Sequence, residues 1–266
     1  MKKLMLALVA VALGFSNAAF AADMAVKARP APPAPIFSWT GFYIGAHAGG
    51  AWFDKDWFEP LTPINIAGGC AGCPGPAGSH SASSWLAGGQ VGFNYQTGMW
   101  VFGVEADASA TDLKATSSLV PLAPIFLINS RTDAVGTIAG RIGVASNQAL
   151  FYVKGGGAWA NDRFFTSGSG VIPPPPLVGV PLQQADDTRW GWMVGVGVEY
   201  AFTPNWSVKA EYNYLDLGTR RETLQPVLAN CPGCGPFQYD IRQRMDLVKI
   251  GLNYRFGWAG PVVAKY

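Results

Sequence analysis

The feature that most constrains this chain is a strict alternation of large apolar residues with small or polar ones. From Arg189 to Phe202 the sequence reads RWGWMVGVGVEYAF, in which every second residue from Trp190 onward is bulky and apolar. The intervening residues are small or charged, apart from Met193. Because successive side chains of a β-strand point to opposite faces, this period of two predicts a strand with one apolar face.

The same alternation recurs in seven further segments, residues 39–53, 91–95, 100–107, 138–144, 151–159, 205–216 and 248–256. Tight turns are predicted at residues 97–98, 146–148 and 203–205. Long connections are predicted at residues 54–83, 115–129, 166–187 and 219–236. Short and long connections in alternation are typical of an up-and-down membrane barrel with short periplasmic turns. The sequence therefore predicts an all-β, membrane-spanning, eight-stranded antiparallel up-and-down β-barrel.

The aromatic residues indicate which face meets lipid. Trp100, Phe151 and Trp206 are among the aromatics beside the short turns, whereas Trp85 and Trp192 are among those eight to ten residues away along the strands. At ~3.3 Å per residue and ~40° tilt this spacing is roughly 20–25 Å, the height of an outer-membrane apolar band. The alternative is a soluble barrel with the aromatics inside. Its outer face would then be rich in Gly and Ala, with few charges, which disfavours it.

Composition and the N-terminus agree with a membrane protein that is exported. The chain is 49% hydrophobic and 14% charged, yet its longest apolar run, residues 4–13, is too short for a transmembrane helix. Lys2 and Lys3, the apolar residues 4–15 and the Ala19-Phe20-Ala21 motif form a signal peptide, residues 1–21. Its removal leaves 17 basic and 17 acidic residues. The mature chain therefore has no surplus of basic residues, and a nucleic-acid partner is not expected. The remaining parts are a Pro-rich periplasmic segment at 22–38, the barrel at 39–256 and a C-terminal tail at 257–266.

The inward face of the predicted barrel carries ten charged residues. Eight strands enclose a space just wide enough for side chains, and unpaired buried charges are costly, so these residues are expected to pair as a structural lining. They are Glu105, Asp107, Glu199 and Glu211, with Arg141, Lys154, Arg189, Lys209, Lys249 and Arg255. The alternative is that the same residues line a narrow pore for small solutes.

Four segments resemble a known family. WTGFYIG (39–45), WVFGVEAD (100–107), TPNWSVKAEYNYLDLG (203–218) and VKIGLNYRF (248–256) are similar to the outer-membrane immunogenic and hemin-binding proteins of alphaproteobacteria, relatives of the OmpA transmembrane barrel. The resemblance spans residues 39–256. It implies a surface barrel of the outer membrane that supports envelope integrity, with lipid, lipopolysaccharide and the barrel-assembly machinery as partners. Some members bind hemin or host cells, but no motif here carries that role, so no cofactor is expected.

The resemblance also concerns the two ends of the mature chain. In related barrels a mature N-terminus of Ala-Asp is joined covalently to peptidoglycan, and Ala22-Asp23 matches this pattern. The Pro-rich segment that follows would act as a semi-rigid spacer, or alternatively as a free periplasmic tail. Family members often end at the aromatic residue of the last strand. Here Phe256 is followed by ten residues, so either Phe256 or Tyr266 is the residue that the assembly machinery reads.

The cysteines and histidines are the remaining candidates for chemistry. Cys70 and Cys73 follow the first strand and Cys231 and Cys234 precede the last, so the two pairs lie near the closing seam. In an exported protein they are predicted to form disulfides, as two small loops or two cross-links. A zinc site of four thiolates is the alternative, which an oxidising compartment disfavours. His47 is predicted to face inward and His80 to lie in a long loop. No catalytic motif accompanies them, so the chain is not expected to be an enzyme.

Overall fold

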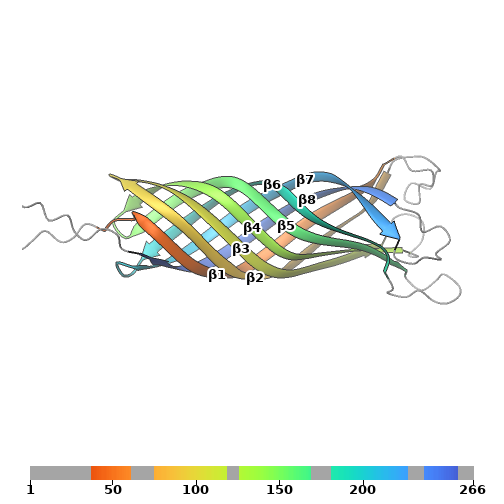
Figure 1. Cartoon of the computed structure of the whole chain (residues 1–266), viewed down its shortest axis with the longest axis horizontal. Helices are drawn as coiled ribbons and strands as arrows, with labels where there is room; N and C mark the ends of the chain where they lie inside the picture. The colour runs from red at the N-terminus through yellow and green to blue at the C-terminus, as the bar shows by residue number, and fades with distance from the viewer. Residues whose placement is uncertain (1–36, 61–74, 119–125, 169–180, 227–236, 257–266) are drawn as a thin grey trace, which may run out of the picture. The chain divides into compact units, whose positions relative to one another are not determined.

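The computed structural model describes residues 37–60, 75–118, 126–168, 181–226 and 237–256. These residues form eight antiparallel strands that pair in chain order and close between the first and the last (Figure 1). The predicted fold class is therefore confirmed. The strands are β1 (Gly41–Glu59), β2 (Gly75–Thr97), β3 (Trp100–Ser118), β4 (Phe126–Ser146), β5 (Ala149–Gly168), β6 (Pro181–Ala201), β7 (Trp206–Pro226) and β8 (Phe237–Arg255).

Three short turns gather at one end of the barrel, which also holds the start of β1 and the end of β8 (Figure 1). Two of them need a backbone in the left-handed region, where Gly98 has φ +59° and Asn147 has φ 52°. Gly and Asn are the residues that adopt this conformation most readily, which explains why the chain reverses there. Among the described residues no helix is long and apolar enough to cross a membrane.

The strands are longer than the sequence predicted, and this corrects the predicted long connections. β1 continues to Glu59 and β2 begins at Gly75, although residues 54–83 were expected to be a loop. β3 to β7 likewise extend into segments that were expected to be connections, and β8 begins at Phe237, ahead of its predicted start at Val248. The reason is that the outward face of the strands changes from apolar to charged there. Asp54 and Asp56 are exposed while Lys55 and Trp57 are buried, so no apolar alternation marks the strand.

The outward face has an apolar band between two groups of aromatic residues, as predicted. Exposed valine and isoleucine side chains fill its middle, including Val104, Ile138, Val194 and Ile250. At the short-turn end the exposed aromatics include Trp100, Phe151, Phe202, Trp206 and Phe256. At the other edge of the band they are Trp52, Trp85, Trp190 and Trp192. We call this second group the outer aromatic ring.

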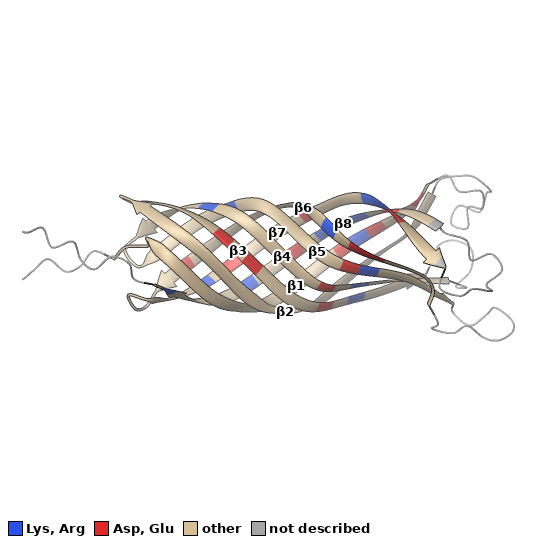
Figure 2. Cartoon of the chain, in the orientation of Figure 1, with Lys and Arg blue, Asp and Glu red and all other residues tan. Residues whose placement is uncertain are grey.

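Beyond the outer aromatic ring the outward face is charged rather than apolar. Charged residues crowd the part of the strands nearer the long connections (Figure 2). Several form exposed ion pairs between or along strands, such as Lys114–Asp112, Arg131–Asp133, Arg163–Asp186, Arg221–Asp240 and Arg244–Asp56. Charged side chains of this kind prefer water to hydrocarbon, so this part of the barrel stands outside the lipid.

The interior is filled in layers. Nearest the short turns is an apolar cluster built around Trp39, Val101, Leu150, Tyr152 and Ala201. Farther along the strands come buried charged residues and then a second apolar cluster that includes Phe53, Leu86, Leu113, Met193 and Leu247. A third cluster lies beyond the outer aromatic ring, with Trp57, Ile128, Phe164, Tyr239 and Ile241. The core of this protein is thus the inside of the barrel.

Candidate functional site

The most distinctive feature of the interior is a group of eight buried charges, four acidic and four basic. We call it the ionic cluster, and its members are Glu105, Asp107, Glu199, Glu211, Arg141, Lys154, Lys209 and Lys249. All come from the set predicted to line the barrel, and none is more than 7% exposed. With equal numbers of each sign, the cluster carries no net formal charge.

Glu105 of β3 lies at the centre of the ionic cluster. Its carboxylate is 3.0 Å from Lys154 Nζ, 2.9 Å from Lys209 Nζ and 3.5 Å from Arg141 Nη1. Glu211 is shared by the same two lysines, at 3.0 Å from Lys154 and 3.1 Å from Lys209. Each lysine therefore bridges two carboxylates, which compensates its removal from water.

Two tyrosines complete the hydrogen bonds of these carboxylates. Tyr43 donates to Glu105 at 2.8 Å and Tyr152 donates to Glu211 at 2.5 Å. The space that each ring needs comes from a glycine on a neighbouring strand. A Cβ atom at Gly92 would lie 2.2 Å from the Tyr43 hydroxyl, and one at Gly197 would lie 2.5 Å from Tyr152 Cζ. Inward glycines are thus required by packing at these positions.

The other two acidic residues are held by further strands. Asp107 accepts from Lys249 Nζ at 2.6 Å and from the Thr137 hydroxyl at 2.5 Å. Glu199 lies 3.3 Å from Arg141 Nη1 and accepts from Asn253 Nδ2 at 2.8 Å. The cluster thereby joins β3, β4, β5, β6, β7 and β8 across the inside of the barrel.

Two of the predicted lining residues are buried but lie apart from the ionic cluster, so the prediction that they pair within one lining was wrong. Arg189 lies farther out, where it donates to Gln243 Oε1 at 3.1 Å and to the Ile241 carbonyl at 2.5 Å. Arg255 lies at the short-turn end and donates to the Pro204 carbonyl at 2.5 Å. The alternation of residues shows which face a side chain occupies but not its height in the barrel.

Sequence reasoning missed a second buried ion pair beyond the outer aromatic ring. Lys55 Nζ lies 2.8 Å from Asp162 Oδ1, and both side chains are fully buried. The ammonium also lies 4.6 Å from the Phe53 ring centre and 4.8 Å from that of Phe164. The signal was Lys55 between two exposed aspartates, but it fell in a segment interpreted as a loop. Above this pair, Trp57 packs against Phe164 and Tyr239, with ring centres 5.5 Å apart in each case.

The two histidines are both engaged inside the barrel. His47 Nε2 lies 2.7 Å from Ser109 Oγ, and its Nδ1 contacts Gln90. His80 was expected in a loop but belongs to β2, where Nε2 lies 2.7 Å from Ser130 Oγ and Nδ1 3.3 Å from Ser117 Oγ. Burial, and secondarily the positive charge of Lys55, lowers the pKa of His80 to about 4, so it is neutral at ordinary pH.

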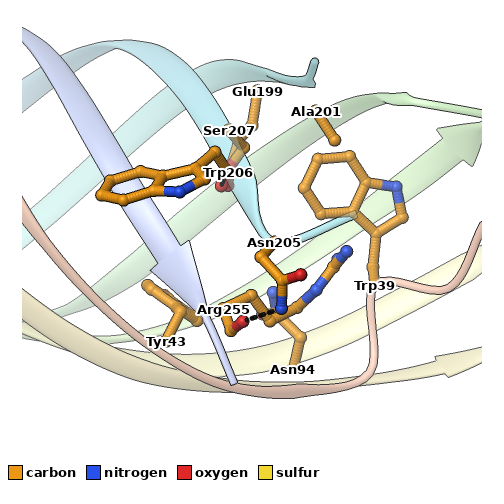
Figure 3. A pocket seen from close by; sticks show the side chains of 9 residues that line it. All are labelled: Trp39, Tyr43, Asn94, Glu199, Ala201, Asn205, Trp206, Ser207 and Arg255. Carbon is orange, nitrogen blue, oxygen red and sulfur yellow. Dashed lines mark hydrogen bonds between the residues drawn. The ribbon is translucent and has the colours of Figure 1, made fainter. Parts of the chain in front are cut away.

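One small cavity lies inside the barrel. A cavity of about 10 Å³ near the short turns is lined by Trp39, Tyr43, Arg255 and their neighbours (Figure 3), which is room for one water molecule. Among the residues the structure describes, no three His, Cys, Asp or Glu side chains are grouped to hold a metal ion. The predicted disulfide cysteines Cys70, Cys73, Cys231 and Cys234 lie outside the described residues, as do Ala22 and Asp23.

Comparison with known proteins gives the family. Residues 7–256 match the family model described as the outer membrane protein beta-barrel domain. The chain belongs to this family of outer-membrane β-barrels. It is therefore a protein of the outer membrane, and its family is not one of enzymes. This confirms the family resemblance seen in the sequence, although hemin binding is not part of what the match shows.

Named relatives agree. The chain is 29% identical over 272 residues to the 31 kDa outer-membrane immunogenic protein of Brucella melitensis, covering 96% of this chain and 100% of that protein. It is 25% identical over 254 residues to the 25 kDa outer-membrane immunogenic protein of Brucella abortus, covering 93% of this chain and 95% of that one. Among solved structures, the outer membrane protease OmpT from Escherichia coli matches with a TM-score of 0.50 and 9% identity, covering 81% of this chain and 97% of that one. This last likeness concerns the fold alone.

Proposed function

We propose that this protein is a closed structural barrel that supports the integrity of the outer membrane and carries its outer loops at the cell surface. The observation that carries this proposal is the filled interior, in which the neutral ionic cluster lies between two apolar clusters. A permeating ion would have to separate buried pairs, which leaves an uncompensated charge at a cost of about 3–5 kcal/mol. This argues against the narrow-pore alternative.

The height of the barrel supports the surface role. From Trp52 in the outer aromatic ring to Glu59 at the end of β1 there are seven residues. At ~3.3 Å per residue and ~40° tilt, this part of the strand rises about 18 Å above the ring. The wall there is charged, so it suits the hydrated headgroup region. The partners we propose are lipid and lipopolysaccharide around this wall, and the barrel-assembly machinery during insertion into the membrane.

The hemin-binding alternative receives no support from the described residues. An axial ligand to heme iron is commonly a histidine with a free ring nitrogen. Both nitrogens of His47 and of His80, the only histidines of the chain, lie within hydrogen-bonding distance of polar side chains. A spectral titration with hemin that gave a saturable Soret shift would contradict this argument.

Covalent attachment to peptidoglycan through Ala22, followed by Asp23, is the finer part of the proposal. It is supported by the resemblance at the mature N-terminus and by the prolines that follow, Pro30, Pro32, Pro33 and Pro35, which favour an extended spacer. Mass spectrometry of muropeptides from purified sacculi tests it. We expect a species carrying the Ala22 N-terminus, and its absence would remove the attachment while leaving the closed barrel intact.

Two measurements test the structural role itself. A deletion strain should leak periplasmic enzymes and become sensitive to large antibiotics, and the wild-type gene should restore both. Purified protein in planar bilayers should give no stable conductance steps. Reproducible stepwise openings would overturn the closed-barrel proposal and favour the pore.

A further inference from the structure

A short segment before β1 folds under the barrel at the short-turn end. Trp39 precedes the first strand, yet it is only 1% exposed and packs in the apolar cluster with Val101, Leu150 and Tyr152. Phe37 packs against the same cluster, so the packed part of the barrel begins ahead of the predicted boundary at Trp39. We call residues Phe37 to Thr40 the clasp.

The clasp bonds to the end of β2 beside one short turn and directly to a second short turn. The backbone N–H of Trp39 donates to Gln96 Oε1 at 2.7 Å, beside the β2–β3 turn. Its indole N–H donates to the carbonyl of Asn147 in the β4–β5 turn at 3.3 Å. The Thr40 hydroxyl accepts from the backbone N–H of Gln96 at 2.9 Å. Gln96 and Asn147 lie 57 and 108 residues after Trp39 in the sequence, so these bonds join distant parts of the chain.

The third turn is reached through Arg255 at the end of β8. Its guanidinium carbon lies 4.4 Å from the Phe37 ring centre and 5.4 Å from that of Trp39. The same guanidinium donates to the Pro204 carbonyl, and Asn205 Nδ2 donates to the Arg255 carbonyl at 2.8 Å (Figure 3). The clasp therefore connects the chain entering the barrel with every short turn and with the last strand.

We propose that the clasp is the mechanical anchor through which a pull on the N-terminal segment enters the barrel. The proposal rests on the proposed attachment of that segment to peptidoglycan. A load that arrives at Phe37 meets the clasp before it meets the ladder of β1. The clasp distributes the load over three turns and over β8, because its bonds reach all of them.

Without the clasp the load would fall on the first residue pairs of β1. These are Gly41 with Asn94 on β2 and Tyr43 with Arg255 on β8, so the β1–β8 seam would open from its end. Hydrogen bonds at a strand end rupture one after another when the end is pulled away, whereas the clasp must break several contacts together. A role in packing alone would not depend on where the force is applied.

Single-molecule force spectroscopy on the full mature protein in a lipid bilayer tests this, with the handle at the N-terminus. The wild type should show a first rupture peak before the peaks of the strands. Trp39→Ala should abolish this first peak or lower its force at least about twofold while leaving the later peaks unchanged. Trp100→Ala is the matched control, because Trp100 is 47% exposed at the same end and lies outside the clasp.

A second variant keeps the test informative if Trp39→Ala folds poorly. Phe37 precedes β1 and its ring contacts the Arg255 guanidinium. Phe37→Ala removes this contact without changing any strand, so it should lower the first peak while the folded barrel keeps its heat-modifiability on gels. An absent first peak in the wild type, or one that is equal in Trp39→Ala and Trp100→Ala, would overturn the anchor.

The cellular arm separates the two proposals. Strains with Trp39→Ala should keep the Ala22 muropeptide but release more outer-membrane vesicles than strains with Trp100→Ala. Equal vesicle release with the muropeptide present overturns the anchor. A missing Ala22 muropeptide overturns the attachment on which the anchor rests, whatever the force measurement gives.

Discussion

Replacement of Glu105 by Gln probes the ionic cluster at its centre. The wild-type carboxylate accepts from Tyr43 and contacts Lys154, Lys209 and Arg141. The amide has nearly the same size but no charge, so the cluster would hold four cations and three anions. Breaking a buried ion pair by neutralising one partner costs about 3–5 kcal/mol, and we expect Glu105→Gln to lower the free energy of unfolding by that amount.

A second substitution separates charge from packing. In Glu105→Gln/Lys209→Met the remaining cluster has three cations and three anions, and Glu211 keeps Lys154 at 3.0 Å and the Tyr152 hydroxyl at 2.5 Å. If the unpaired charge causes the loss, the double variant should recover about 1–3 kcal/mol relative to Glu105→Gln. If lost packing causes it, the double variant should be less stable than either single variant.

The assay is urea unfolding of the barrel in lipid vesicles, followed by tryptophan fluorescence and by heat-modifiability on gels. Asp186→Asn is the matched control, since it is also a carboxylate-to-amide change in an ion pair, with Arg163, but on the exposed wall. Exposed pairs contribute less than about 1 kcal/mol. A cost for Glu105→Gln no larger than that for Asp186→Asn would refute the reasoning.

Three further predictions concern packing, protonation and the cysteines. Gly197→Ala should cost about 1–3 kcal/mol because its new methyl overlaps the Tyr152 ring, whereas Gly140→Ala, with nothing within 4 Å, should be near neutral in the same unfolding assay. Beyond the outer aromatic ring, burial and a hydrogen bond with Asp187 raise the pKa of Glu222 to about 7. At Glu222 the folded state therefore binds more protons than the unfolded state between about pH 4.5 and 7, so this group's contribution to stability should fall as the pH rises through that window. The lowered pKa of His80 acts in the opposite direction, so the check is a comparison of melting temperatures at pH 5 and pH 8 in the wild type and in Glu222→Gln, in which the gain in stability from pH 5 to pH 8 should be larger. Non-reducing peptide mapping should find the cysteines as disulfides, and four free thiols would contradict that prediction.

The sequence predicted the half of the barrel inside the membrane much better than the half outside it. Within the band, lipid selects apolar residues on one face, so the alternation from Trp190 to Phe202 locates the strand and its orientation. Beyond the outer aromatic ring, water selects polar residues on the outside while the inside still needs side chains that pack. There Lys55 and Trp57 face inward beside outward aspartates, and a mixture of charged and aromatic residues has no readable period.

The clasp and the separation of the two arginines could not be predicted for another reason. Both depend on how far along the barrel axis a residue lies once the strands tilt and pair. Arg189 and Arg255 share the inward face with Glu105, but they lie toward opposite ends of the barrel. In the sequence Trp39 resembles a residue of the first strand. Its burial at the end of the barrel depends on its contacts at the β2–β3 and β4–β5 turns, which only the folded structure brings together.

The ionic cluster also constrains the pairing of the strands. Glu105 on β3 meets Lys209 on β7, and Asp107 on β3 meets Lys249 on β8, so these partners come together only when the sheet closes. A slip of β7 by one residue would turn Lys209 and Glu211 toward lipid, because successive side chains alternate between faces. A lysine on the lipid face costs up to about 2–4 kcal/mol at the midplane and less toward the interface where Lys209 lies, with a further cost for the carboxylate. The charges left unpaired inside would add to that penalty, so the cluster disfavours the nearest wrong register more strongly than apolar side chains at the same positions could.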